Sequence, residues 1–191
     1  LRHIKLRGEL SQGLVLPLYG EYSEDFDLTE TLGIQKWEKD IPASMSGKMR
    51  GNFPSEIPKT DQPRIQNINR NLESYIADGE TFQVTEKLHG TSATFYLDKN
   101  DVFHVCSRNI DLLESGDNLY WQVARELDLE NKMREQEMHG LAIQGEIIGP
   151  GINGNQYGME EPEFYVFDVF DTNDKSYVST NQTDVDAAHL G

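Results

Sequence analysis

The spacing of the apolar residues changes at Gly79, and this change restricts the fold more than any other feature of the sequence. Before Gly79 the apolar residues recur three or four positions apart, which predicts an amphipathic helix with a buried stripe formed by Ile65, Ile68, Leu72, Tyr75 and Ile76. After Gly79 apolar and polar residues alternate, which predicts strands over residues 82–86, over residues 91–97 and around Phe103 and Val105. A helix is therefore followed by an antiparallel hairpin that turns at residues 98–101.

Later segments extend this pattern. Asp117 is placed to cap a helix carrying Leu119, Val123 and Leu127, and two further strands are predicted at residues 141–148 and 164–170. For the first helix, Asp61 offers an N-cap, Pro63 an early helical position and Gly79 an end. The order strand, strand, helix, strand, strand predicts an α+β fold with antiparallel sheets.

The amino-terminal part has a different composition. Residues 1–18 alternate apolar and polar side chains, and Pro17 ends this strand-like stretch because proline cannot continue a central strand. Residues 21–63 are first acidic and then rich in Ser, Gly and Pro, which is typical of an irregular connector. We therefore expect a domain boundary here, with the end of a β module and a linker in residues 1–50 and the main domain in residues 51–191.

Length and composition exclude several classes of protein. The 191 residues suffice for one domain with a core and a small appendage. No apolar run is long enough to span a membrane, and the chain does not begin with a leader-like sequence. Cys106 is the single cysteine, which fits a reducing compartment, so we expect a cytoplasmic protein.

The net charge of -16 at first argues against a nucleic-acid partner. However, the acidity is local. Residues 1–70 contain 10 basic and 10 acidic residues, and residues 71–191 contain 7 basic and 23 acidic ones. The overall charge therefore does not exclude binding to nucleic acid.

A lysine followed three positions later by a glycine occurs three times, at Lys5, Lys48 and Lys87. The spacing cannot choose among them, but the context favours Lys87. It follows the predicted strand 82–86, and Gly90 permits the sharp turn into the next strand. We expect the amine at that turn to be partly desolvated, which lowers the pKa of a lysine and makes it nucleophilic.

Four segments then carry a resemblance to a known family. Residues 86–92 (EKLHGTS) resemble motif I of the covalent nucleotidyltransferases, and RNA ligases in particular. Residues 107–109 (SRN), 144–146 (QGE) and 164–168 (FYVFD) are similar to motifs Ia, III and IIIa, in the family order. Upstream, residues 51–54 and 58–67 resemble a subgroup of RNA ligases with an oligonucleotide-binding module before the catalytic domain.

The resemblance implies a role for each matching residue. Lys87 would attack the α-phosphorus of ATP and retain AMP, with Glu146 and Arg108 as further catalytic residues. Glu86 would accept a hydrogen bond from adenine, and Phe167 would stack on the purine. Asp168 would support the side of the nucleotide pocket that Phe167 forms. Glu146 would contact the ribose or hold Mg²⁺ or Mn²⁺ through water. The remaining residues implied to bind ATP or AMP are Leu88, His89, Gly90, Ser92 and Arg64.

The implied activity is ATP-dependent RNA ligation, in RNA repair, by a monomer that joins 5'-phosphate and 3'-hydroxyl ends, including those of a nicked duplex. DNA ligation, GTP-dependent capping of messenger RNA and nucleotide binding without catalysis stay open as alternatives. Two departures from the family pattern affect the site. His89 replaces an aspartate that some relatives carry, and the sequence ends before motifs IV and V. We therefore expect this chain alone to bind ATP and to transfer AMP poorly.

Residues 149–154 fit the pattern G-x-G-x-x-G of dinucleotide-binding proteins. Pro150 and the absence of a predicted helix after the glycines argue against that function, so we interpret these residues as a flexible loop. The five histidines and Cys106 have no metal-ligand spacing, and no structural zinc is expected.

Overall fold

The computed structural model describes residues 4–6, 9–11, 20–23, 26–33, 47–60, 62, 64–82 and 84–190. The chain divides into two units, Leu1–Lys39 and Asp40–Gly191. In the first unit, β1 (Ile4–Leu6) and β2 (Glu9–Ser11) form an antiparallel pair. The strand-like stretch around Pro17 and the proposed helix-start residues Asp61 and Pro63 lie outside the described residues.

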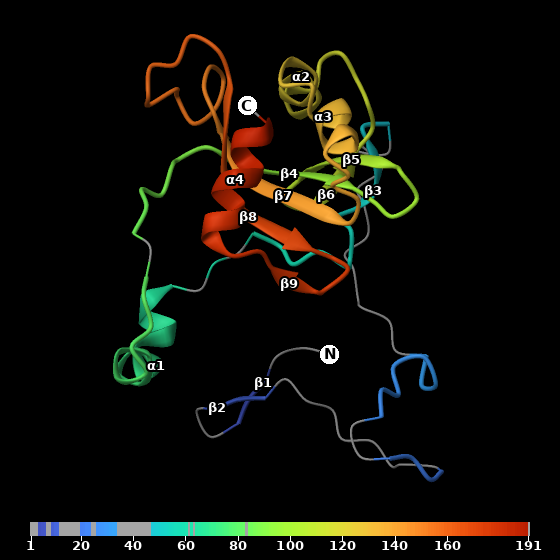
Figure 1. Ribbon diagram of the computed structural model, residues 1–191, viewed down its shortest axis with the longest axis vertical. Coiled ribbons are helices and arrows are strands. Elements are labelled where there is room, and N and C mark those ends of the chain that lie inside the picture. The colour runs from blue at the N-terminus through green and yellow to red at the C-terminus, as the bar shows by residue number, and fades with distance from the viewer. Residues whose placement is uncertain are drawn as a thin grey trace. The chain divides into compact units, whose positions relative to one another are not determined.

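The second unit is built on an antiparallel sheet of seven strands, in the order β3-β6-β5-β4-β7-β8-β9 (Figure 1). The strands are β3 (Met49–Asn52), β4 (Thr91–Leu97), β5 (Phe103–Ser107), β6 (Ile110–Leu112), β7 (Leu141–Ile148), β8 (Glu163–Asp171) and β9 (Ser176–Tyr177). The helices are α1 (Ile65–Ala77), α2 (Leu119–Glu126), α3 (Leu129–Glu135) and α4 (Thr180–Leu190). The predicted mixed α+β fold is confirmed.

The main hydrophobic core lies between one face of the sheet and the helices α2, α3 and α4 (Figure 1). The alternating apolar residues of β4 and β7 supply the sheet side of this core, including Phe95, which is fully buried and stacks against Phe103. A smaller apolar cluster on the opposite face contains Phe53, Ile57 and Phe170. The sheet is thus buried on one face and partly covered on the other.

Several predicted elements agree closely with the structure. The strands at 91–97 and 141–148 coincide with β4 and β7, and the strand at 164–170 lies within β8. The turn at residues 98–101 forms because Asp98 Oδ1 accepts hydrogen bonds from the backbone of Asn100 and Val102. The α2 cap is shifted by one residue, since Asn118 rather than Asp117 accepts from the backbone of Tyr120.

The predicted strand at residues 82–86 is wrong. Residues 84–89 have no regular secondary structure, and Val84 is 93% exposed. The reason is the pairing of β4, whose two edges are occupied by β5 and β7. A strand at residues 82–86 therefore has no free edge of β4 to join.

The α1 stripe is less buried than predicted. Ile65 and Ile76 are 61% and 73% exposed, and Ile68, Leu72 and Tyr75 are partly buried. The end of the helix does follow the prediction, because Gly79 adopts a left-handed conformation with φ of 72° directly after the cap residue Asp78. Amphipathic spacing shows that a helix has an apolar face, but not what packs against that face.

The predicted irregular connector contains structure that its composition did not indicate. β3 lies within it as an edge strand of the sheet and pairs with β6, and Phe53 and Ile57 are buried. β3 was missed because a four-residue edge strand with the sequence MRGN has no alternation. α3, α4, β6 and β9 were not predicted either, since each is short or weakly amphipathic.

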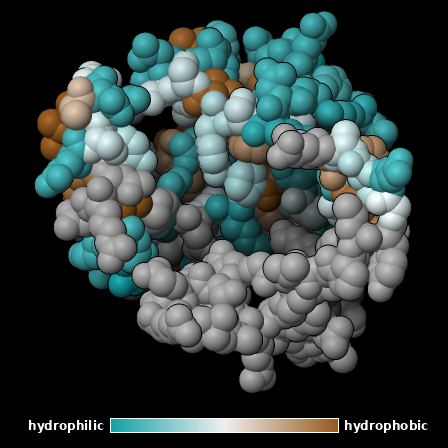
Figure 2. Space-filling model, turned by 90° about the horizontal axis from the view of Figure 1, so that it is seen from below, coloured by the Kyte–Doolittle hydropathy of each residue, from teal (hydrophilic) through white to brown (hydrophobic). Residues whose placement is uncertain are grey.

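The surface of the described residues is mainly hydrophilic. Figure 2 shows this on the face seen from below, where apolar residues interrupt the hydrophilic colours in separate places. None of the helices in the described ranges combines the length and the apolar character needed to cross a membrane.

Candidate active site

The polar face of the sheet brings together residues from distant parts of the chain. Ser92 of β4 pairs with Glu146 of β7, and Gln144 of β7 pairs with Asp168 of β8. Directly paired residues share a face of a sheet. Their neighbours Ala93 and Ile143 point into the helix-covered core, so Ser92, Gln144, Glu146 and Asp168 lie on the opposite face. We call these four residues the polar face.

The turn before β4 is joined to the polar face through Gly90. Its backbone N–H donates to Glu146 Oε1 over 3.0 Å. A side chain at Gly90 would collide with the neighbouring strand, because an added Cβ would lie 2.1 Å from the carbonyl oxygen of Ile147. The segments that resemble motifs I and III therefore meet where two backbones lie so close together that only glycine fits.

Lys87 lies three residues before Gly90 in this turn, and its side chain is exposed. The desolvated environment expected for the amine is not found, because the strand that was to precede it is absent. Glu86 and His89 are exposed as well, and Leu88 is partly buried. The position of Lys87 thus depends on how the turn is held rather than on burial of the lysine.

A β-bulge presents Phe167. Gln144 pairs with Asp168 and Gly145 pairs with Val166, so Phe167 is the extra residue of β8, and it is 40% exposed. Gly145 makes room for this irregularity, since an added Cβ would lie 2.4 Å from the carbonyl oxygen of Tyr165. The bulge leaves an aromatic ring accessible beside the polar face.

A segment that precedes α1 crosses the polar face. Gln144 Nε2 donates to the carbonyl oxygen of Pro58 over 2.9 Å, and the hydroxyls of Thr60 and Ser92 share a hydrogen bond of 2.6 Å. Further along, Gln62 Nε2 donates to Asp168 Oδ2 over 2.7 Å. Sequence reasoning singled out this stretch only by resemblance and did not anticipate these contacts, which link β4, β7 and β8.

Burial raises the pKa of the Asp168 carboxyl above its ordinary value, and the hydrogen bond from Gln62 opposes this rise. The carboxylate is therefore less favourable in the folded protein than in the unfolded chain. A half-buried carboxylate accepting from a neutral amide is a destabilising feature that suits a functional role more than a structural one.

Asp168→Asn is accordingly expected to raise the free energy of unfolding at pH 7. A raised folded-state pKa means that the native protein binds more protons than the unfolded chain between the two pKa values, so stability falls as the pH rises through that window. The difference in the free energy of unfolding between Asp168→Asn and the wild type should shrink as the pH falls toward the ordinary aspartate pKa of about 3.9. Urea unfolding of both proteins between pH 4 and 7 measures this difference, and a gain that does not depend on pH would contradict it.

The two predicted arginines lie outside the strands, Arg108 between β5 and β6 and Arg64 at the start of α1. Arg108 directly follows β5, whose last residue Ser107 pairs with Ala93 of β4, and its side chain is exposed. Arg64 is the N-cap residue of α1 and is exposed. Among the described residues, no hydrogen bond or ion pair joins Arg64 to the polar face.

The loop between β7 and β8 supplies two contacts that were not predicted. Asn153 Nδ2 donates to the carbonyl oxygen of Gly90 over 2.7 Å, and the Tyr157 hydroxyl accepts from the backbone N–H of His89 over 2.9 Å. The sequence offers only the glycine-rich pattern as a signal, which we interpreted as a flexible loop. That interpretation is wrong, because the loop is bonded to the turn.

The chain offers few ligands for a metal ion. Among the residues that the structure describes, no three His, Cys, Asp or Glu side chains are grouped so that they could hold one. The Glu146 carboxylate is bonded to the Lys87 turn through the backbone N–H of Gly90. This arrangement fits a hydrated ion bound mainly through phosphate oxygens, since Mg²⁺ commonly uses one or two carboxylates and keeps several waters.

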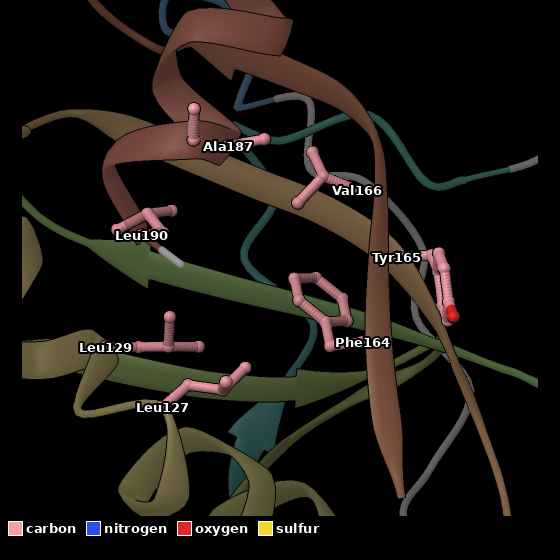
Figure 3. A pocket seen from close by; sticks show the side chains of 8 residues that line it. Leu127, Leu129, Phe164, Tyr165, Val166, Ala187 and Leu190 are labelled. Atoms are coloured by element: carbon pink, nitrogen blue, oxygen red, sulfur yellow. The ribbon is translucent and has the colours of Figure 1, made fainter. Parts of the chain in front are cut away.

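A pocket of about 280 Å³ lies elsewhere, between β8, α4 and the connection of α2 to α3. Figure 3 shows the side chains of Leu127, Leu129, Phe164 and Leu190 around a common space. None of the predicted nucleotide-binding residues lines this pocket. Its apolar walls do not suit a charged nucleotide.

The fold and the polar face define an α+β protein with a lysine-bearing turn above an antiparallel sheet. A sequence profile described as RNA ligase matches residues 80–191. The chain belongs to the RNA ligase family, which confirms the resemblance found in its motifs. No curated protein matches the chain.

Solved structures of a Naegleria gruberi RNA ligase are similar to the whole chain. A variant with ATP and Mn is 38% identical, with a TM-score of 0.70 and coverage of 99% of this chain and 57% of that one. A variant with AMP and Mn is 38% identical, with a TM-score of 0.70 and coverage of 100% and 57%. The ligase with PPi is 37% identical, with a TM-score of 0.69 and coverage of 100% and 58%. The chain therefore spans a little over half the length of these relatives.

Proposed function

We propose that this chain is the nucleotide-binding part of an ATP-dependent RNA ligase and that Lys87 becomes covalently linked to AMP. The observation that carries the proposal is the hydrogen bond from Gly90 to Glu146, because it joins the turn of the nucleophile to a carboxylate on the polar face. The relatives support it, since their structures contain ATP with Mn, AMP with Mn, or PPi. These are the substrate, the transferred group and the leaving group of such a step.

In the proposed step the neutral amine of Lys87 attacks the α-phosphorus of ATP. A bond forms between Nζ and phosphorus, the bond from the α-phosphorus to the bridging oxygen breaks, and pyrophosphate leaves with the electron pair. The nitrogen then loses one proton to solvent, and the product is a lysyl phosphoramide of AMP. The exposure of Lys87 leaves room for the triphosphate to approach.

The nucleotide would lie over the polar face. Phe167 supports this proposal, because its accessible ring on the bulge suits stacking against a purine. Asp168 and Ser92 would line the nucleotide site, where they accept or share hydrogen bonds with Gln62 and Thr60. Leu88 and His89 would contact the nucleotide from the turn. Arg108 and Arg64 would supply positive charge near the phosphates.

Mg²⁺ or Mn²⁺ would neutralise phosphate charge when bound. Glu146 is the residue of this chain that we propose for holding its hydrated form. One oxygen of Glu146 already accepts from Gly90, so the other would contact a metal-bound water or a ribose hydroxyl. Glu146 would then connect the Lys87 turn to the hydrated ion through hydrogen bonds.

The later steps of ligation involve RNA. We propose that AMP passes to a 5'-phosphate end of RNA, which a 3'-hydroxyl end then attacks with release of AMP. We also propose that residues 1–50 are the end of an oligonucleotide-binding-like β module and its linker, and that residues 51–191 belong to the adenylyltransferase domain. We further propose that the protein acts as a monomer, in the cytoplasm and in RNA repair.

Mass spectrometry of the full-length gene product after incubation with ATP and Mn²⁺ tests the first step. The expected result is one AMP per protein, located by peptide mapping on Lys87. Absence of any adduct, or an adduct on a different lysine, would overturn the proposal.

Glu86 should select adenine over guanine. It directly precedes Lys87 and is exposed, so its carboxylate is available to accept a hydrogen bond from the adenine amino group, which guanine lacks at that position. ATP is expected to label the protein at least about tenfold better than GTP, since one hydrogen bond to a charged group is worth about 1.5–3 kcal/mol. Glu86→Ala should reduce labelling by ATP to a similar degree. Equal labelling by the two nucleotides would instead indicate a capping enzyme.

A further inference from the structure

The loop that joins β7 to β8, residues 149–162, has a backbone that few sequences can adopt. Six of its residues have positive φ angles: Gly149 at 141°, Gly151 at 77°, Asn153 at 44°, Gly154 at 74°, Asn155 at 50° and Gly158 at 64°. All six are glycine or asparagine, the residue types that enter this region most readily. The glycine pattern of the loop therefore encodes a defined conformation.

Contacts inside the loop hold that conformation. Asn155 Nδ2 donates to the carbonyl oxygen of Met159, and Asn155 Oδ1 accepts from the backbone N–H of the same residue. Ile152 is buried in the main core, and its backbone N–H donates to the carbonyl oxygen of Gly149. The loop is thus fastened to the sheet at its start and closed by its own side chains.

From this base the loop holds the turn of Lys87. Three polar backbone groups in succession are engaged by side chains: His89 N–H by the Tyr157 hydroxyl, Gly90 N–H by Glu146 and the Gly90 carbonyl oxygen by Asn153. In a strand, backbone groups of a neighbouring strand would do this. Residues 84–89 have no strand partner, so these side chains take over that role.

We propose that Asn153 and Tyr157 are positioning residues that fix the turn of Lys87 for attack on ATP. This inference rests on the proposed function. Neither residue touches the reacting atoms, and each acts through the backbone of His89 or Gly90. Attack requires the amine to lie in line at close distance, and displacement by about 1 Å costs up to about 10²-fold in rate. Most of the contacts to ATP would come from the polar face and Phe167, so loss of these two bonds should slow the attack by Lys87 much more than it weakens ATP binding.

Tyr157→Phe and Asn153→Asp test the proposal in the full-length gene product. Phenylalanine keeps the ring and removes the hydroxyl acceptor, whereas aspartate tolerates the left-handed backbone and lacks the amide donor. Each variant is expected to form the AMP adduct about tenfold more slowly in a single turnover. The Kd for ATP, measured separately by calorimetry, should stay within about twofold of the wild type. A loss that appeared only in the Kd would overturn the positioning role.

Two matched variants serve as controls. Tyr22 is 37% exposed, as Tyr157 is, and its ring stacks on Phe26, which Tyr22→Phe preserves. Asn173→Asp removes another exposed side-chain amide donor to a backbone carbonyl oxygen, that of His139, outside the loop of residues 149–162. Both controls are expected to form the adduct at nearly the wild-type rate. Equal slowing by Asn173→Asp and Asn153→Asp would overturn the proposal, because the effect would then not depend on the bond to Gly90.

Hydrogen exchange measured without nucleotide separates this proposal from the proposed function. Tyr157→Phe should accelerate exchange of the His89 amide, and Asn153→Asp should accelerate exchange across residues 86–90, while the two controls leave these amides unchanged. Unchanged exchange in both test variants would overturn the positioning role even if Lys87 carries AMP. If the wild type forms no adduct, the proposed function fails. Faster amide exchange of residues 86–90 in Tyr157→Phe and Asn153→Asp would still show that these two side chains hold the turn in place.

Discussion

Replacement of Lys87 by alanine is expected to abolish the AMP adduct, with a loss of at least about three orders of magnitude in rate. The physical reason is the removal of the only atom proposed to bond to phosphorus. Lys5→Ala and Lys48→Ala should retain the adduct, although both lysines share the spacing to a following glycine. Lys48 lies at the edge strand β3, and Gly51 has no atom within 4 Å of an added Cβ. Lys87 belongs to a turn that is joined to the polar face by the bond from Gly90 to Glu146.

Lys87→Arg separates nucleophilicity from charge. Arginine keeps the positive charge, but the guanidinium does not lose its proton in proteins, so it cannot attack phosphorus. This variant is expected to bind ATP and to form no adduct. Calorimetry measures ATP binding, and single-turnover labelling with radioactive ATP followed by peptide mapping measures adduct formation. Adduct formation by Lys87→Ala at the wild-type rate would exclude Lys87 as the nucleophile.

Gly90→Ala is the second change with a large expected effect. The added methyl group would lie 2.1 Å from the carbonyl oxygen of Ile147 and 2.8 Å from Cγ of Glu146, so the turn has to move away from β7. This movement breaks the bond to Glu146 and displaces Lys87. We expect adduct formation to slow by about 10²-fold, with a loss of about 1–3 kcal/mol in the free energy of unfolding from the steric strain.

Gly51→Ala is the matched control for this substitution. Gly51 has the same spacing to Lys48 as Gly90 has to Lys87, but its surroundings are open. The control should leave the rate of adduct formation unchanged. Rate measurements and urea unfolding of both variants separate displacement of the turn from loss of the fold. Wild-type activity in Gly90→Ala would show that the close approach of the two backbones is unimportant for the step.

Local sequence patterns sufficed to predict two kinds of element: those that pair with a neighbour close in the sequence, and strands with a long apolar or alternating sequence. β4, β5 and the turn at Asp98 could be predicted because the hairpin closes over a few residues and Asp98 bonds to its own turn. β7 and β8 could be predicted from their length and apolar content. The motif residues were also visible, because each motif is contiguous in the sequence. Family membership followed from the order of these motifs.

The tertiary structure decided which surfaces those elements share. Residues 82–86 alternate as a strand does, yet residues 84–86 form no strand, because β4 has both edges occupied. The bulge at Phe167 depends on pairing between β7 and β8, and local alternation carries no information about that register shift.

The hold on the Lys87 turn likewise comes from residues far along the chain. Tyr157 and Asn153 are 68 and 63 positions from the groups they bind. Gln62 is 106 positions from Asp168. A sequence by itself determined the chemistry available to this protein, namely a lysine, a carboxylate, an aromatic ring and the glycines between them. Only the packing of the sheet and its loops decided which lysine is held beside that carboxylate, because such contacts depend on distances in space that spacing along the chain does not specify.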